Sequence, residues 1–219
     1  SSAPGIDDNV FFDQNSFNVL SSVVLDLSIM QCKSFDCSTI TSPSNIIGAS
    51  SSVLEVYGDW NSSPLISNAF LGQITFASGS SSFIKSEGIS FQGQINFDGI
   101  GSWELKDNLN TLGKLKIIKG SLATGDAAQL LSGSFNVTCL GLFINGVKPR
   151  TLKAGTSTFT ITGADTAFIF SPVNLFLYEE LATFKFTNIG VDTARYFSSG
   201  VTDTITNLNI ASSTILFED

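Results

Sequence analysis

The sequence contains no histidine, and this absence excludes several kinds of chemistry. Ser-His-Asp and Cys-His catalysis, zinc sites with histidine ligands and the commonest general base all need an imidazole ring. The sequence also has no Gly-x-x-x-x-Gly-Lys phosphate-binding loop and no Gly-Gly-x-Gly-x-Asp calcium repeat. We therefore expect a protein that is not an enzyme and that has no catalytic, cofactor-binding or metal-binding residues.

Charged residues are also scarce, at 14% of the 219 residues, against about 25% in an average soluble domain. The net charge of −8 argues against nucleic acid or an anionic membrane as a partner. No apolar run approaches the roughly 20 residues that cross a bilayer, so we expect no membrane span. The 19 phenylalanines, set among Ser, Thr, Gly and Asn, are typical of a β-sheet protein with a neutral, hydroxylated surface.

Cysteine is limited to three residues. Cys32 and Cys37 flank a short segment, so they could form a local disulfide, which would indicate an oxidising compartment. They could equally be two buried thiols on neighbouring β positions, and the sequence leaves both possibilities open. Cys139 has no obvious partner, and we expect its thiol to be buried.

The most informative feature present is a repeat of apolar–x–apolar pairs at steps of about 20 to 25 residues. The polar residue between the two apolar ones gives the period of two that is typical of β-strands. The second members of these pairs, together with Phe35, form a predicted column of ten: Phe12, Phe35, Val56, Phe76, Phe97, Ile117, Val137, Ile161, Phe186 and Ile210.

A step of this length fits either one turn of a solenoid or one hairpin of a sandwich. Hairpin signals are rare, because Asn-Gly and Asp-Gly occur only at Asn145-Gly146 and Asp98-Gly99. Further pairs between the column positions, such as Trp103/Leu105, suit the other faces of a coil. The sequence thus predicts an all-β, right-handed parallel β-helix of about ten rungs of 20–25 residues. An antiparallel β-sandwich is the alternative.

No linker or charge block interrupts the chain, so we expect one domain over residues 1–219. The sequence begins with Ser1 rather than Met, and a strand-like segment runs almost to Asp219. An exposed last rung would invite edge pairing. We therefore expect the chain to be a fragment of a longer protein.

Several segments, in this order, resemble repeat regions of very large secreted surface proteins of Bacteroidota, the adhesin-like cargo of type IX secretion. The resemblance covers most of the chain to about Phe170 and is looser beyond it. It rests on structural motifs: Ile6 to Asp13, Asn15 to Phe17, Cys32 to Asp36, Leu54 to Gly58, Gly101 to Leu109, Gly120 to Thr124 and Arg150 to Phe159. The C-terminal sorting domain that is typical of such cargo is missing from the sequence.

The resemblance implies an extracellular or cell-surface location and a non-enzymatic structural or adhesive module, either a rod-like spacer or a ligand-presenting segment. Its partners would be neighbouring segments of a longer surface protein, the secretion machinery, or an extracellular glycan or surface. The alternative is a β-helix protein that binds or degrades polysaccharide.

The polysaccharide alternative has weak candidate residues. Glu179 and Glu180, near Tyr178 and with Lys185 and Arg195 further on, could serve a lyase or hydrolase, although a charged loop is the more common origin of such a group. Trp60, next to Asn61-Ser62-Ser63-Pro64, is predicted to be the exposed tryptophan that could stack on sugar. Trp103 alternates with Leu105 and is predicted to lie in the core.

Two further groups are better explained by solvent exposure than by function. Asp7, Asp8 and Asp13 could bind calcium through oxygen ligands, but solvated turn residues are the simpler interpretation. Thr158, Thr160 and Thr162 alternate as in an ice-binding ladder, but the pattern is one rung long and indicates a solvated strand face.

Overall fold

The computed structural model describes residues 3–17, 21–125, 135–163, 168–170, 174–178, 182–187, 193–197, 207–210 and 214–218. Over these ranges the chain forms strands β1 to β24 and no helix. Every strand pairing in this part of the chain is parallel. The protein is therefore a parallel β-solenoid of about 7 turns, and the antiparallel sandwich is excluded.

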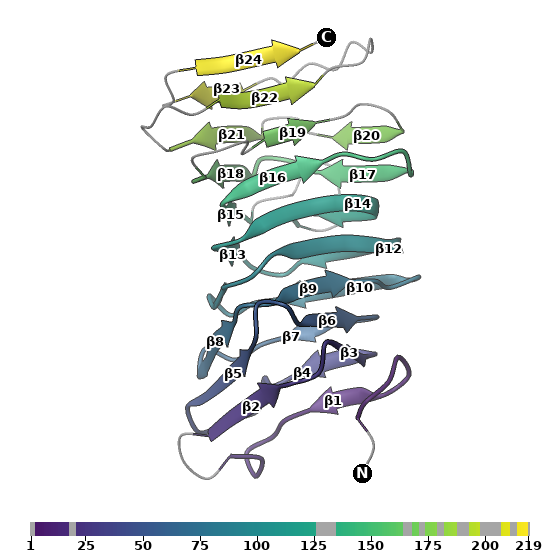
Figure 1. Ribbon diagram of the computed structural model, residues 1–219, viewed down its shortest axis with the longest axis vertical. Helices are drawn as coiled ribbons and strands as arrows, with labels where there is room; N and C mark the ends of the chain where they lie inside the picture. The colour runs from purple at the N-terminus through teal and green to yellow at the C-terminus, as the bar shows by residue number, and fades with distance from the viewer. Residues whose placement is uncertain are drawn as a thin grey trace.

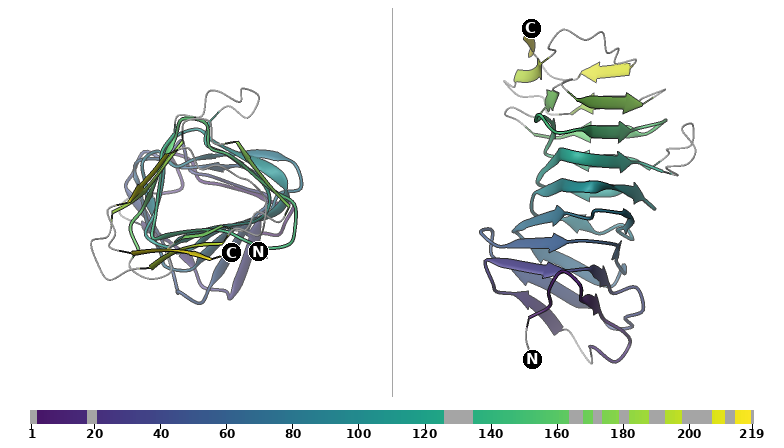
Figure 2. Two further views of the ribbon diagram at one scale, coloured as in Figure 1. Left: turned by 90° about the horizontal axis from the view of Figure 1, so that it is seen from above. Right: turned by 90° about the vertical axis from the view of Figure 1, so that its right-hand side faces the viewer.

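The strands stack along the long axis of the molecule, with β1 at one end and β24 at the other (Figure 1). Seen along that axis, the coil has a three-sided outline (Figure 2). From β2 to β20 each turn contributes a strand to each of three faces, which we number in the order in which the chain meets them from β2 onward.

The first face consists of two sheets in line. One contains β2 (Ser21–Leu25), β5 (Ser44–Gly48) and β8 (Ile66–Phe70). The other contains β11 (Ser90–Phe91), β13 (Leu109–Thr111), β15 (Val137–Cys139), β18 (Thr158–Ile161), β21 (Thr183–Phe186) and β23 (Asn207–Ile210).

The second and third faces share two long strands, β12 (Ile95–Leu105) and β14 (Lys114–Ala123). Their first halves lie on the second face with β3 (Ile29–Cys32), β6 (Val53–Val56), β9 (Gln73–Phe76), β16 (Gly141–Ile144) and β19 (Phe168–Phe170). Their second halves lie on the third face with β1 (Asn9–Phe11), β4 (Ser34–Asp36), β7 (Trp60–Asn61), β10 (Ser81–Lys85), β17 (Arg150–Lys153) and β20 (Leu175–Tyr178). A separate pair, β22 (Thr193–Phe197) and β24 (Thr214–Glu218), completes the described strands.

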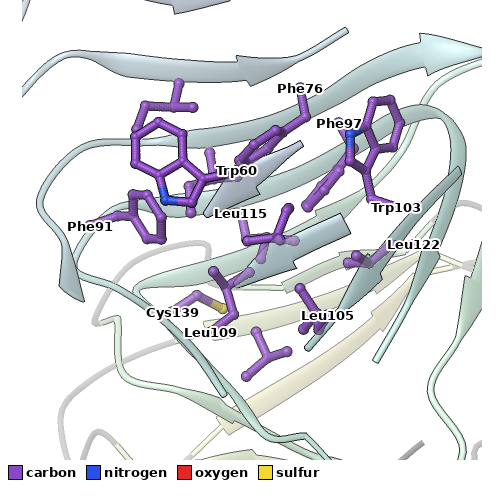
Figure 3. Close-up of a cluster of buried hydrophobic side chains, with 14 of the residues drawn as sticks. Trp60, Phe76, Phe91, Phe97, Trp103, Leu105, Leu109, Leu115, Leu122 and Cys139 are labelled. Carbon is purple, nitrogen blue, oxygen red and sulfur yellow. The ribbon is translucent and has the colours of Figure 1, made fainter. Parts of the chain in front are cut away.

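The core consists of files of like residues stacked from turn to turn. Parallel pairing in register places each inward side chain directly above its counterpart in the preceding turn. The clearest file, on the second face, joins Met30, Leu54, Ile74, Ile95, Leu115, Leu142 and Phe168. The aromatic rings of Phe76 and Phe97 stack in the same way, with 5.4 Å between their centroids, and the Trp103 ring packs tilted against Phe97 within β12 at 5.5 Å (Figure 3).

The predicted single column of ten is wrong in one respect, because its members lie on all three faces. Val56, Phe76, Phe97 and Ile117 do form one file on the second face. Phe35 pairs with Trp60 on the third face. Val137, Ile161, Phe186 and Ile210 belong to strands of the first face, and there Ile161 pairs with Cys139 rather than with Val137.

The cause of this error is that all three faces carry the same apolar–x–apolar pattern. After Leu115 the chain next returns to the second face at Leu142, a longer step than usual. The pair reached about 20 residues after Ile117 therefore belongs to the first face. The expected ten rungs also exceed the observed count of about 7 turns.

Glycines at the corner between the first and second faces allow successive turns to approach closely. This corner repeats a residue–Gly dipeptide in four turns: Leu71-Gly72, Gln92-Gly93, Leu112-Gly113 and Thr162-Gly163. In the remaining turn Leu140 takes the position beside Gly113. A Cβ added at Gly93 would lie 1.7 Å from the carbonyl oxygen of Gly72, and one at Gly113 would lie 2.3 Å from that of Gly93. These positions exclude any side chain because backbone packs directly on backbone.

We expect Phe97→Asp to lower the free energy of unfolding by at least about 4 kcal/mol, because it places an unpaired carboxylate between apolar layers. Phe97 is fully buried, whereas Ile100 on the same strand is 80% exposed. Ile100→Asp is therefore the matched control and should change stability by no more than about 0.5 kcal/mol. Urea unfolding followed by circular dichroism measures both, and equal effects of the two changes would contradict the core assignment.

We expect Gly93→Ala to cost about 3 kcal/mol or more, because its methyl group cannot fit above the Gly72 carbonyl without moving the turn. Gly88 provides a control, because nothing lies within 4 Å of an added Cβ there. Its φ is +77°, so a substitution costs only the backbone strain of that conformation. Gly88→Ala should cost about 1 kcal/mol. The same unfolding measurement applies, and a mild effect at Gly93 would refute the close approach.

Candidate functional site

The two tryptophans are both core residues. Trp103 is fully buried, as predicted. The prediction that Trp60 is exposed is wrong: the residue is 1% exposed and its ring stacks on Phe35 at 4.6 Å. Its indole Nε1 donates a hydrogen bond to Ser62 Oγ at 2.6 Å, which satisfies its polar atom inside the protein. Figure 3 shows both indoles within the apolar cluster, so neither can stack on a sugar.

The N-terminal carboxylates are turn residues. Asp13 accepts hydrogen bonds from Asn15 N at 2.9 Å and from Ser16 Oγ at 3.0 Å, and these bonds lower the pKa of its carboxyl group. Asp8 accepts a hydrogen bond from Gly5 N at 2.9 Å. These contacts account for both residues as local caps.

The remaining sequence candidates are not brought together as a site. Glu179 and Glu180 lie outside the described residues. Lys185 is exposed on β21 of the first face, and Tyr178 is exposed on β20 of the third. Thr160 pairs with Thr138 below and with Lys185 above, so a lysine interrupts the threonine file on the outer surface.

The three cysteines are free, buried thiols. Cys32 ends β3 on the second face, and Cys37 follows β4 on the third, so the disulfide alternative is not realised. Burial raises the pKa of each of the three thiols to about 12, because a thiolate would lose its hydration in the core. They are therefore packing residues rather than nucleophiles.

A groove that sequence reasoning missed lies on the outer surface, where the second face turns into the third. It has a volume of about 540 Å³ and extends over parts of β10, β12, β14, β17 and β20. Its hydroxyl groups come from Ser80, Ser81, Ser102, Ser121 and Thr151, its apolar surface chiefly from Ile100, Pro149 and Phe176, and its charges from Lys119 and Lys148.

The hydroxyl groups follow the register of the sheet. Ser81 pairs with Ser102, Ser102 with Ser121, and Ser121 with Thr151, so one hydroxyl per strand faces outward along the rod. Phe176 comes next in the same file and is 59% exposed. Ser102 Oγ donates a hydrogen bond to Ser81 Oγ at 3.0 Å.

One wall of the groove is the loop of residues 145–149, which connects β16 to β17. The buried Arg150 donates from Nη1 to the carbonyl oxygens of Gly146 at 2.6 Å and Lys148 at 2.9 Å. Asn174 Nδ2 donates to Val147 O at 2.9 Å, and Gly120 N donates to Pro149 O at 3.0 Å. The loop is therefore fixed by side chains and backbone from three different turns.

The signal that could have revealed the groove is a hydroxyl residue placed just before an inward apolar residue: Ser102-Trp103, Ser121-Leu122 and Thr151-Leu152. Gly-Ser at 101–102 and again at 120–121 repeats this pattern in the sequence. The sequence does not show that these dipeptides lie on the same face, because the number of residues between them is not constant.

No family model matches the chain, and no curated protein or solved structure is significantly similar to it. Within the described ranges, no helix meets the length and hydropathy needed for a membrane span. Over the same ranges, no three Cys, Asp or Glu side chains cluster as metal ligands would.

We expect all three thiols to resist Ellman's reagent at pH 8 in the folded protein and to react once it is unfolded in denaturant. Their pKa of about 12 leaves almost no thiolate at that pH. Because the unfolded thiols ionise near 9.0, stability should also fall as the pH rises from about 9 towards 12. Rapid labelling of any thiol in the native state would contradict this burial.

Proposed function

We propose that the chain is a non-enzymatic structural module of a secreted or surface-displayed protein: a rod that holds neighbouring segments apart and presents its outer surface to ligands. The observation that carries this proposal is the parallel ladder, which runs along the rod through successive turns on each face. A stack in which each turn contacts its neighbours behaves as a quasi-one-dimensional structure, and its length is set by the number of turns.

Side chains at the corner between the third and first faces add links between turns. Asn136 N donates to Asn108 Oδ1 at 2.8 Å, and Thr158 N donates to Asn136 Oδ1 at 2.9 Å. Asp107 accepts hydrogen bonds from Ser86 N and Ser86 Oγ, both at 2.8 Å. Each such bond satisfies a polar group at a bend of the chain, where the strand ladder is interrupted. The links support a load-transmitting role for the rod.

The location and partners belong to the same proposal. An extracellular or cell-surface rod of type IX cargo would contact neighbouring segments of a longer surface protein, the secretion machinery, and an extracellular glycan or surface. The sequence resemblance supports this setting, as does the low content of charged residues on a chain rich in Ser and Thr. The groove at the corner between the second and third faces favours polysaccharide binding over degradation, since no carboxylate occurs among its lining residues in the described part of the chain.

We expect that removing residues 74–94 leaves a folded rod that is one turn shorter. The deletion joins Gln73 to Ile95, which pairs with Ile74, so the register is preserved on the second and third faces. Spin labels on Ser38→Cys and Asn145→Cys, both exposed positions on either side of the deletion, should approach each other by about 5 Å. Double electron–electron resonance measures this change.

Removing only residues 74–84 is the control, because it shifts later strands to the wrong face and should abolish folding. An unfolded one-turn deletion would contradict the modular rod. The non-enzymatic part of the proposal is tested separately, by incubating the protein with acidic and neutral polysaccharides. Release of reducing ends or of unsaturated products from any of them would overturn it.

A further inference from the structure

The groove at the corner between the second and third faces has a charge opposite to that of the whole chain. The chain has a net charge of −8, yet among the residues that the structure describes the charged ones that line the groove are Lys119 and Lys148. Lys119 Nζ lies 3.3 Å from Asp98 Oδ1, which offsets part of its charge. Lys148, on the exposed loop, is therefore the main cation offered to a ligand. A positive site on an acidic protein selects a ligand with negative charge.

The hydroxyl file gives the site a direction. Ser81, Ser102, Ser121 and Thr151 occupy successive strands, and Phe176 continues the file on the next strand. Five strands at a spacing of about 4.8 Å extend over roughly 20 Å along the rod. A site with one polar group at each step suits a linear polymer that lies parallel to the rod axis.

The position of Lys148 is fixed before any ligand binds. Arg150 holds the carbonyl oxygens on both sides of Val147, and Asn174 holds that of Val147 itself. Two backbone conformations at this wall are unusual, with φ of +135° at Gly146 and +55° at Asn174. Glycine adopts a positive φ without strain and asparagine tolerates it better than most residues, so both residue types suit this part of the wall. A fixed loop also reduces the entropy that a ligand must lose on binding.

We propose that this groove binds a linear acidic polysaccharide that contains uronate residues. The carboxylate groups of the polymer bind Lys148 and Lys119, and its hydroxyl groups bond to the serine and threonine file. The apolar face of one sugar ring packs on the exposed ring of Phe176. This ligand goes beyond the spacer role, because a spacer needs no ligand.

Two other polyanions fit the site less well. A nucleic acid would meet the repulsion of the acidic chain with only two lysines to offset it. An acidic peptide could use the lysines, but it does not offer a hydroxyl group at every step to match the file from Ser81 to Thr151. The groove provides both kinds of contact, and a uronate polymer uses both.

The test is isothermal titration of the full chain with oligogalacturonate, with a neutral cello-oligosaccharide and poly-glutamate as comparison probes. We expect binding of oligogalacturonate alone. Lys148→Glu and Phe176→Ala should each weaken it about tenfold or more, since one removes a charge-assisted contact and the other removes the apolar contact. Both side chains are exposed, so neither change should affect folding.

Lys185→Glu is the matched control, because it makes the same charge change at an exposed position on the first face. It should bind oligogalacturonate as the parent chain does. Absence of binding, equal loss in Lys185→Glu, or preference for poly-glutamate or the neutral oligosaccharide would each overturn the proposal. None of these results would affect the deletion test of the rod, so the two proposals can fail separately.

Discussion

The parallel hydrogen-bonded stack of turns, at one strand spacing per turn, is the constraint on which the rest of the structure depends. Because neighbouring turns lie in register, whatever one turn places inside must fit the same position of the next. This explains why like residues form files, such as Leu54, Ile74, Ile95 and Leu115, and why Phe76 stacks on Phe97. It also explains the glycine corner, where Gly93 packs on the carbonyl group of Gly72 and no side chain has room.

The same constraint decides how much of the fold was readable from the sequence. Alternation of apolar and polar residues predicted the strands, and the scarcity of hairpin signals predicted the parallel architecture. Within the second face the file from Val56 to Ile117 was predicted correctly. The choice of face was not readable, because the inward pattern is the same on all three faces, and so Val137 was assigned to the wrong file.

The site was far less predictable than the core. Trp60 is followed by polar residues in the sequence and was predicted to be exposed. Instead its ring stacks on Phe35 and its indole Nε1 donates a hydrogen bond to the Ser62 hydroxyl group. The groove depends on which residues of different turns meet on the outer surface. The stack places Ser102, Ser121 and Thr151 side by side although the steps between them are unequal. Only the register of the strands shows that they belong together.

Unequal steps are also where this fold can acquire function. In β14 the chain passes from Ile117 to Leu122 without leaving the strand, whereas the next turn inserts a loop between Ile144 and Leu152. The core tolerates the insertion because Leu152 still stacks on Leu122, and the added residues are pushed outward. Arg150 occupies a buried position where an apolar side chain would pack in the core, and it uses its guanidinium group to hold the carbonyl groups of that loop instead. The regular turns thus make the rod rigid. The inserted loop adds a preformed outer surface, and its side chains can vary to suit a ligand without disturbing the core.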